Sequence, residues 1–453
     1  MLERASAATR WGLGCTLTAL ALAFPREARS CSGPCSTPEL WDIDVVGATP
    51  GLTANFGLLS HDGGQWRAVC EEAIGGVLLG ASADPSGRFV STVNGLFLQS
   101  ESACEFSAVR VIDETEGFLL DFSLPARGGE PSSLRFALTE NLEQQQAVLR
   151  ADVDLDFESV HVFQAGSAYS HVTSGGTPVA VFATGYTFDP RTWQVAFSLD
   201  AGDTWSELSP ELQVDNVTLV PVAVDPWAPQ RLYLRLQGAS NLPAELWRFD
   251  AESESVERVL TLDRTEAFAG LAVTQSKLYV AGRETADDNE GTDQGSLYAA
   301  DRADPSFEQL FDDGPPFGCL GTDGEALYTC VNNFTRDSEF LLARSDDEGG
   351  AWVPLLELEE LGTVASCGAV CEATTQWLHG TFGVLGAGGS AGSASSGGGP
   401  AGAGAESNDR DGGSGCHVAH TPQGAGARAV LLAAAFAGFF HGFRRGARQS
   451  SIC

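Results

Sequence analysis

The stretch that decides the fold is Ser198-Leu199-Asp200-Ala201-Gly202-Asp203-Thr204-Trp205, which reads S-x-D-x-G-x-T-W. It follows an alternating apolar run over 193–197, so a strand leads into it. The Asp200 carboxylate can accept hydrogen bonds from backbone amides of a turn, and Gly202 tolerates the positive φ that a tight turn needs. The closing threonine and tryptophan suit a half-buried strand. The stretch therefore predicts two antiparallel strands joined by a tight turn.

The same spacing recurs twice in the chain. Ser345-x-Asp347-x-Gly349-x-Ala351-Trp352 carries Ala in place of Thr, and Ser60-x-Asp62-Gly63-Gly64-Gln65-Trp66 is a shortened copy. The motif resembles the Asp box, or BNR repeat, of sialidases, sortilin-type receptors and photosystem II assembly factors. The resemblance implies a β-propeller in which these aspartates cap turns on the face opposite the one that binds ligands. It implies no particular reaction.

Strand-like apolar segments recur along the chain at intervals of 39 to 52 residues. Their centres are Leu58, Phe97, Leu149, Phe197, Trp247, Tyr298 and Leu342. In several units a strand rich in Leu, Tyr and Val precedes the centre, and a turn with a further strand follows it. Four short strands at this period are typical of propeller blades. We therefore predict an all-β, seven-bladed β-propeller over 31–385, with six or eight blades as alternatives.

The two ends of the chain have the composition of export and anchoring signals. Residues 1–30 combine basic residues with a short apolar core, which predicts a signal peptide helix. Residues 386–415 form a flexible linker rich in Gly, Ala and Ser. The last segment, 416–453, starts at Cys416 and continues through an apolar helix, 429–443, to basic residues at 444–448.

This C-terminal order resembles the sorting signal of myxobacterial surface proteins (MYXO-CTERM), which implies processing near Cys416. A plain transmembrane anchor is the alternative, because basic residues after an apolar helix mark the inner side of a membrane. Both interpretations predict an exported protein anchored through its C-terminus at the cell surface or outer membrane.

Charge restricts the partners. The chain has 60 acidic and 26 basic residues, a net charge of −34. Nucleic acid is excluded as a partner, because binding to phosphate needs a basic surface. We expect a well-solvated monomer whose partner is a protein or glycan at the cell surface.

Cysteine usage agrees with export. Once Cys15, Cys416 and Cys453 of the end segments are set aside, an even number remains, which predicts disulfides. These residues are Cys31, Cys35, Cys70, Cys104, Cys319, Cys330, Cys367 and Cys371. Cys319 should pair with Cys330 across a hairpin, and Cys70 with Cys104. The pairs 31/35 and 367/371 bond locally or to each other, and a zinc site is the alternative.

Motifs for catalysis are missing from the sequence. Sialidases carry an Arg-Ile-Pro-like segment in an early blade, which this chain lacks, and most of its tyrosines recur in strand repeats, which indicates core packing. The chain also lacks the G-x-S-x-G, H-E-x-x-H and phosphate-loop motifs. We therefore predict no catalytic residues and favour a binding or structural module. A sialidase-type glycan hydrolase and a receptor or assembly factor are the alternatives.

One loop has cation-binding chemistry. Residues 287–293 concentrate the oxygen ligands that suit Ca²⁺, but their spacing differs from an EF-hand. A solvated acidic loop is the alternative, and no cofactor is predicted.

Ligand contacts are expected on the loops that join the second and third strands of the blades, because a rigid scaffold concentrates binding residues on such loops. These loops are 186–193, 238–244, 283–294 and 332–337. The predicted contacts are Tyr186, Arg191, Trp193, Arg283, Asp288 and Arg336.

Overall fold

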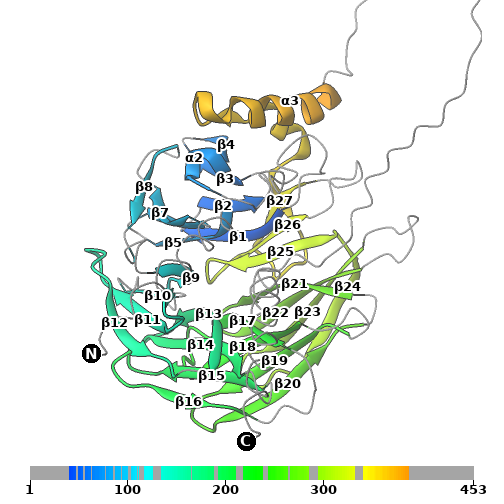
Figure 1. Cartoon of the computed structure of the whole chain (residues 1–453). Helices are drawn as coiled ribbons and strands as arrows, with labels where there is room; N and C mark the ends of the chain where they lie inside the picture. The colour runs from blue at the N-terminus through cyan, green and yellow to red at the C-terminus, as the bar shows by residue number, and fades with distance from the viewer. Residues whose placement is uncertain are drawn as a thin grey trace, which may run out of the picture. The chain divides into compact units, whose positions relative to one another are not determined.

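Seven sheets, each containing four strands that follow one another in the sequence, make up most of the structure (Figure 1). The structure is a computed structural model, and it describes residues 40–386 apart from internal stretches. Those stretches are 47–48, 55–56, 63, 77, 85–86, 93, 100–103, 110, 112–116, 126–133, 165, 188–191, 211–217, 238–242, 264–265, 285–293 and 332–339. The arrangement is a seven-bladed β-propeller, so the predicted fold and blade number are confirmed.

The blades are numbered in chain order. Blade 1 contains β1 (Leu40–Val46), β2 (Thr49–Ala54), β3 (Gly57–Asp62) and β4 (Gln65–Cys70); blade 2 contains β5 (Leu78–Asp84), β6 (Gly87–Thr92), β7 (Gly95–Gln99) and β8 (Phe106–Val109); blade 3 contains β9 (Gly117–Ser123), β10 (Arg135–Asn141), β11 (Gln146–Ala151) and β12 (Glu158–Val162). Blade 4 contains β13 (Ser167–Gly175), β14 (Ala180–Thr187), β15 (Trp193–Ser198) and β16 (Ser206–Leu208).

The remaining blades follow the same order. Blade 5 contains β17 (Thr218–Val224), β18 (Arg231–Gln237), β19 (Glu245–Asp250) and β20 (Ser255–Thr261); blade 6 contains β21 (Glu266–Val273), β22 (Lys277–Glu284), β23 (Gly295–Asp301) and β24 (Glu308–Gly314); blade 7 contains β25 (Phe317–Thr322), β26 (Leu327–Val331), β27 (Leu342–Ser345) and β28 (Val353–Leu356). All seven predicted strand centres lie in the third strands of the blades, so the predicted repeat is confirmed.

The first strand of every blade carries a β-bulge against the second strand. The inserted residues are Trp41, Leu79, Leu120, Ser170, Val222, Ala269 and Gly318. A bulge bends its strand and increases the local twist, so the first strand of every blade is bent. The sequence does not reveal this repeat, because the inserted residues share no chemical type.

Tryptophans of the three motif copies join neighbouring blades. Trp205 packs with Phe136 of blade 3, and Trp352 packs with Leu297 of blade 6. Trp66 of blade 1 packs with residues of blade 7, and its indole nitrogen donates to the Leu355 carbonyl at 3.3 Å. Each indole therefore covers the preceding blade of the ring, which explains the recurrence of the residue.

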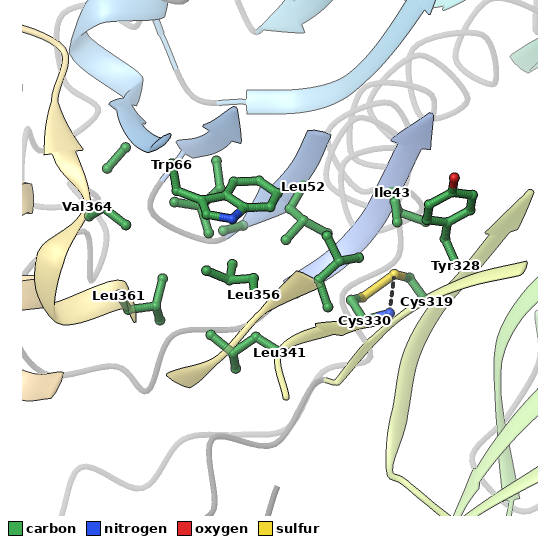
Figure 2. Packing of buried hydrophobic residues seen from close by; sticks show 14 of the residues in the cluster. Ile43, Leu52, Trp66, Cys319, Tyr328, Cys330, Leu341, Leu356, Leu361 and Val364 are labelled. Carbon is green, nitrogen blue, oxygen red and sulfur yellow. Dashed lines mark hydrogen bonds between the residues drawn. A yellow bond between two sulfur atoms is a disulfide. The ribbon is translucent and has the colours of Figure 1, made fainter. Parts of the chain in front are cut away.

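The ring closes without an exchanged strand. β1 contacts β5 on one side and β25 on the other, so the first and last blades are neighbours. Figure 2 shows the core at this junction, where Trp66 and Leu52 of blade 1 lie near Leu341 and Leu356 of blade 7. Blades 7 and 1 share none of their four strands, and their side chains pack against each other at this junction.

A C-terminal segment follows blade 7. It contains η2 (Leu358–Thr363), β29 (Ala365–Ser366), η3 (Ala369–Cys371) and α3 (Glu372–Gly386). β29 pairs in parallel with β4 and so adds a fifth strand to blade 1. α3, which the sequence analysis did not predict, packs Leu378 into the junction core. A short helix, α2 (Glu71–Ile74), follows β4.

The disulfides correct the predicted pairing. Cys319 and Cys330 are bonded across β25 and β26, as predicted. Cys70 does not pair with Cys104, because Cys70 is bonded to Cys371. Cys104 is bonded instead to Cys367. Cys367 and Cys371 therefore bond neither to each other nor to Cys31 and Cys35, so that prediction was wrong as well. Both predictions failed because the C-terminal segment passes close to blades 1 and 2.

Several predictions concern residues outside the described part. They are the signal helix, the transmembrane helix over 429–443, Cys31, Cys35 and Cys416. Among the residues described, no helix combines the length and the apolar character needed to cross a membrane. The disulfides indicate an exported or extracellular protein.

Candidate functional site

Connections in an antiparallel sheet alternate between its two ends. We call the end that carries the connection between the second and third strands the loop end of a blade, and the opposite end the turn end. Each predicted contact loop joins a second to a third strand, from β14–β15 to β26–β27. The S-x-D-x-G motifs over 198–205 and 345–352 join third to fourth strands, so they lie at the turn end. The predicted loops and the motifs therefore lie at opposite ends of the blades, and ligand binding at the loop end stays a prediction.

Loop-end connections differ in length around the ring. In blades 1 to 3 they are the short stretches 55–56, 93–94 and 142–145. In blades 4 to 7 they are the longer stretches 188–192, 238–244, 285–294 and 332–341. Two to four residues are enough to reverse an antiparallel pair, so the additional residues of blades 4 to 7 are not needed to build the fold.

The Ser198–Trp205 turn is closed by its own side chains. The Asp200 carboxylate accepts from the Thr204 amide at 2.8 Å and from the Thr204 hydroxyl at 2.6 Å. The Ser198 hydroxyl accepts from the Gly202 amide at 2.8 Å. Gly202 has a φ of 97°, which glycine adopts without strain. Hydrogen bonds from Thr204, then from Ser198, lower the pKa of Asp200 to about 2.

The second full motif has the same geometry. Asp347 accepts from the Ala351 amide at 2.8 Å, and Ser345 accepts from the Gly349 amide at 2.8 Å. The shortened copy is different. β3 and β4 stay paired up to Asp62 and Gln65, and the Ser60 hydroxyl accepts from Arg88 of blade 2 at 3.0 Å. Ser60 therefore joins two blades instead of capping a turn, because the deletion leaves no loop to cap.

Both full turns are bound to the preceding blade by a basic side chain. Arg150 of blade 3 donates to the Ala201 carbonyl at 2.9 Å and to Asp203 at 2.7 Å. Lys277 of blade 6, the single lysine of the chain, contacts Glu348 at 2.5 Å. Ala201 and Glu348 occupy the same position of the motif. The turn end is therefore a set of contacts between blades.

The predicted ligand contacts have different positions. Tyr186 is half-buried at the end of β14, and Arg283 is half-buried near the end of β22. Trp193 is 4% exposed, and its indole nitrogen donates to the Leu219 carbonyl of blade 5 at 3.1 Å. It is a core residue, so its prediction as a contact was wrong. Arg191, Asp288 and Arg336 lie outside the described residues, as does the predicted calcium loop over 287–293.

Sequence analysis missed a polar cluster at the loop end of blade 6. Glu266, the first residue of β21, accepts from the Tyr298 hydroxyl at 2.8 Å, from the Asp263 amide at 3.1 Å and from the Ser296 hydroxyl. Burial, followed by the hydrogen bond to Glu266, raises the pKa of Tyr298 to about 12. The signal for this cluster is Gly282 on the intervening strand.

A side chain at Gly282 would collide with the cluster. A Cβ there would lie 2.7 Å from the Ser296 hydroxyl oxygen and 3.3 Å from the Glu266 carboxyl carbon. The glycine therefore allows β21 and β23 side chains to meet across β22. The cluster and Arg283 both lie beside the long connection of blade 6.

Most of the tyrosines form part of the core, as predicted. Tyr169, Tyr233, Tyr279 and Tyr328 are buried. Burial raises the pKa of Tyr233 and Tyr328 to about 12, with nearby Asp225 and Asp323 adding to the effect. Tyr186 and Tyr298 are half-buried, and Tyr298, like Tyr328, donates its hydroxyl to a carboxylate.

Over the described part of the chain, no group of three or more His, Cys, Asp or Glu side chains is arranged to hold a metal ion. The carboxylate at the loop end of blade 6 has three protein donors around it. This arrangement orients Glu266 and the phenol as a unit.

Comparisons with known proteins concern the fold alone. No family model and no curated protein matches the chain. It is similar to a GH74 enzyme of Niastella koreensis, with 13% identity and a TM-score of 0.44, over 63% of this chain and 46% of that one. It is also similar to an oligogalacturonate lyase in complex with manganese, with 12% identity and a TM-score of 0.44, over 71% and 85% of the two chains.

A third similar structure is the β-propeller domain of the Trilobed protease from Pyrococcus furiosus, described as having an open velcro topology. The identity is 15% and the TM-score 0.37, over 53% of this chain and 71% of that one.

Proposed function

We propose that this protein is an exported, surface-anchored propeller of the Asp-box type that binds a protein or glycan partner through the loop end of blades 4 to 7. The observation that carries the proposal is the difference in loop length around the ring. Loops longer than the fold requires, held on a rigid scaffold, are where binding residues concentrate. The contacts would include Tyr186, Arg191, Arg283, Asp288 and Arg336.

The Asp-box assignment has its own support. The two full motifs share the same pattern of serine and aspartate hydrogen bonds. They also share a tryptophan packed on the preceding blade. A propeller stabilised in this way can vary its loops without disturbing the contacts between blades.

Anchoring forms the second part of the proposal. The linker over 386–415 would hold the propeller away from the membrane, and segment 416–453 would be the sorting or anchoring signal. Export is supported by the three disulfides. A Cys416→Ala variant tests the sorting signal, because we expect it to stay unprocessed or to be released into the medium. Normal surface display of this variant would contradict the sorting proposal.

Binding is tested on a glycan array with the purified protein and one loop variant. The variant replaces 285–294 with Asn-Gly, a two-residue connection like those of blades 1 and 2. We expect glycans bound by the unmodified protein to lose at least tenfold in affinity for this variant. Asp200→Ala at the turn end is the matched control and should keep its affinity. If the folded loop variant binds as well as the original, the loop proposal fails for blade 6.

A glycan hydrolase of the sialidase type is a second candidate, because the Tyr298 phenol is hydrogen-bonded to Glu266 at the loop end. A phenol beside a carboxylate base can act as a nucleophile. The raised pKa of Tyr298 argues against this role, since the phenol stays protonated at neutral pH. We therefore expect no hydrolysis of a fluorogenic sialoside. Hydrolysis that Tyr298→Phe or Glu266→Gln abolishes would replace the binding proposal by an enzymatic one.

A further inference from the structure

The segment that follows blade 7 contacts three blades. We call residues 357–371 the strap. The strap leaves β28 of blade 7, pairs β29 with β4 of blade 1, and is bonded through Cys371 to Cys70 at the end of β4. Cys367 is bonded to Cys104, just before β8 of blade 2. The strap therefore covers the junction at which the ring closes.

The strap is also embedded in the core of that junction. Leu361 and Val364 are buried in the cluster that contains Trp66 and Leu356, as Figure 2 shows. Cys371 is fully buried and Cys367 is 5% exposed. The Cys70–Cys371 bond is therefore shielded from solvent, whereas the partner of Cys367, Cys104, is only half-buried.

The two strap bonds are nested. Cys70 and Cys371 are separated by 301 residues, and Cys104 and Cys367, which lie within this interval, are separated by 263. Almost the whole propeller, from blade 2 to blade 7, thus lies inside a covalently closed loop. The Cys319–Cys330 bond has a sequence separation of only 11 residues, so the loop that it closes lies within one hairpin.

We propose that the strap is a mechanical clasp that protects the propeller from tension applied at its C-terminus. This inference rests on the proposed anchoring, because an anchored protein is pulled at that end whenever its partner moves away. Tension that enters through α3 reaches Cys371 and crosses directly to Cys70 at the outer strand of blade 1. When the chain is pulled by its two ends, the residues between the two cysteines carry no load along the backbone.

The strap is needed because of the strand order in blade 7. β28 is a four-residue strand at the outer edge of its sheet. A pull on the chain directly after an edge strand opens its hydrogen bonds one at a time, so little force is needed. The Cys70–Cys371 bond removes β28 from the load path, and the nested Cys104–Cys367 bond keeps most of the propeller protected if the first bond is lost.

Single-molecule pulling of the full chain, held by its two ends, tests the clasp. We expect the fully extended oxidised protein to be shorter than the reduced protein by about 1,000 Å, because each locked residue withholds about 3.3–3.6 Å. The first rupture should also need more force in the oxidised chain. Equal rupture forces, or equal final lengths, would overturn the proposal.

Variants separate the contributions of the bonds. In the Cys70→Ser variant, the nested Cys104–Cys367 bond should still keep the fully extended chain about 900 Å shorter than the reduced chain. A Cys319→Ser/Cys330→Ser double variant is the matched control: its bond lies inside the loop that Cys70 and Cys371 close, so both the final length and the first rupture force should be unchanged. If a variant fails to fold, the length that reductant releases from the extended unmodified protein, about 1,000 Å, measures the loop that the strap bonds close. Ligand binding is not part of this measurement, so its result is independent of the loop proposal.

Discussion

The two ends of blades 4 to 7 are built from the same strands but differ in what their connections do. At the turn end, the motifs over 198–205 and 345–352 hydrogen-bond to themselves and contact the preceding blade through Arg150 and Lys277. At the loop end, the connections are longer than the strands require. The recurrent motif therefore marks an end where neighbouring blades contact each other, and the loops of unequal length mark the end at which we propose that a partner binds.

The largest expected effect concerns a residue of the loop end that belongs to the core. Trp193→Ala should lower the free energy of unfolding by about 3–5 kcal/mol, because it empties a buried site between blades 4 and 5. Trp193→Phe keeps most of the packing and loses one hydrogen bond, so it should cost less. Chemical denaturation measures both. A negligible effect of the alanine variant would return Trp193 to the list of ligand contacts.

Next in size is a change in the second motif. Gly349→Ala should cost about 2–4 kcal/mol, because its φ is 93° and the new Cβ would lie 2.5 Å from a Leu297 methyl of blade 6. Gly324→Ala is the control, since its φ is 101° and nothing lies within 4 Å. It should cost only about 1 kcal/mol, the backbone strain alone. Thermal unfolding of the two variants therefore separates blade contact from strain, and equal losses would contradict the contact.

A smaller effect depends on pH. The pKa of Asp200 is lowered to about 2 in the folded protein, against about 3.9 in an unfolded chain. Its stabilisation is therefore present above pH 4 and is lost as the pH falls from about 4 to 2. The carboxylate is exposed, so solvent screening limits the contribution to about 1 kcal/mol.

Asp200→Asn tests this contribution. Unfolding free energies of the variant and the unmodified protein should differ at pH 6 and converge near pH 2. A difference that stays constant over this range would show that the ionised form of Asp200 has no role in the turn.

The smallest effect is at the contact between blades 6 and 7. Lys277→Gln should cost less than about 1 kcal/mol, because the Lys277–Glu348 pair is at the surface. The loss should disappear at high salt. A salt-independent loss would indicate that the lysine stem, and not its charge, holds the turn.

The sequence predicted the fold well because the repeat is local. Third strands such as the one around Phe197 recur at a regular period, and the Asp200 turn follows from residues next to one another. These features can be read without knowing which blades meet. The strand order within each repeat also predicted at which end of the blade each loop lies.

Contacts between distant residues could not be predicted in this way. Cys70 pairs with Cys371 only because the ring closes, whereas a count along the chain favours the nearer Cys104. Glu266 contacts Tyr298 across an intervening strand, which is possible because Gly282 on that strand has no side chain. Trp193 is the first residue of a strand that follows a loop, and an aromatic residue at such a position fits a ligand contact. Only the structure shows that its indole points into the core.

The central claim is that the loop end binds the partner and the turn end holds the ring. The most direct measurement compares the affinities of three folded proteins for the best-bound glycan of the array: the unmodified chain, the 285–294 loop variant and Asp200→Ala. The account predicts a loss of at least tenfold for the loop variant and no change for Asp200→Ala. An affinity lost in Asp200→Ala and kept in the loop variant would contradict it.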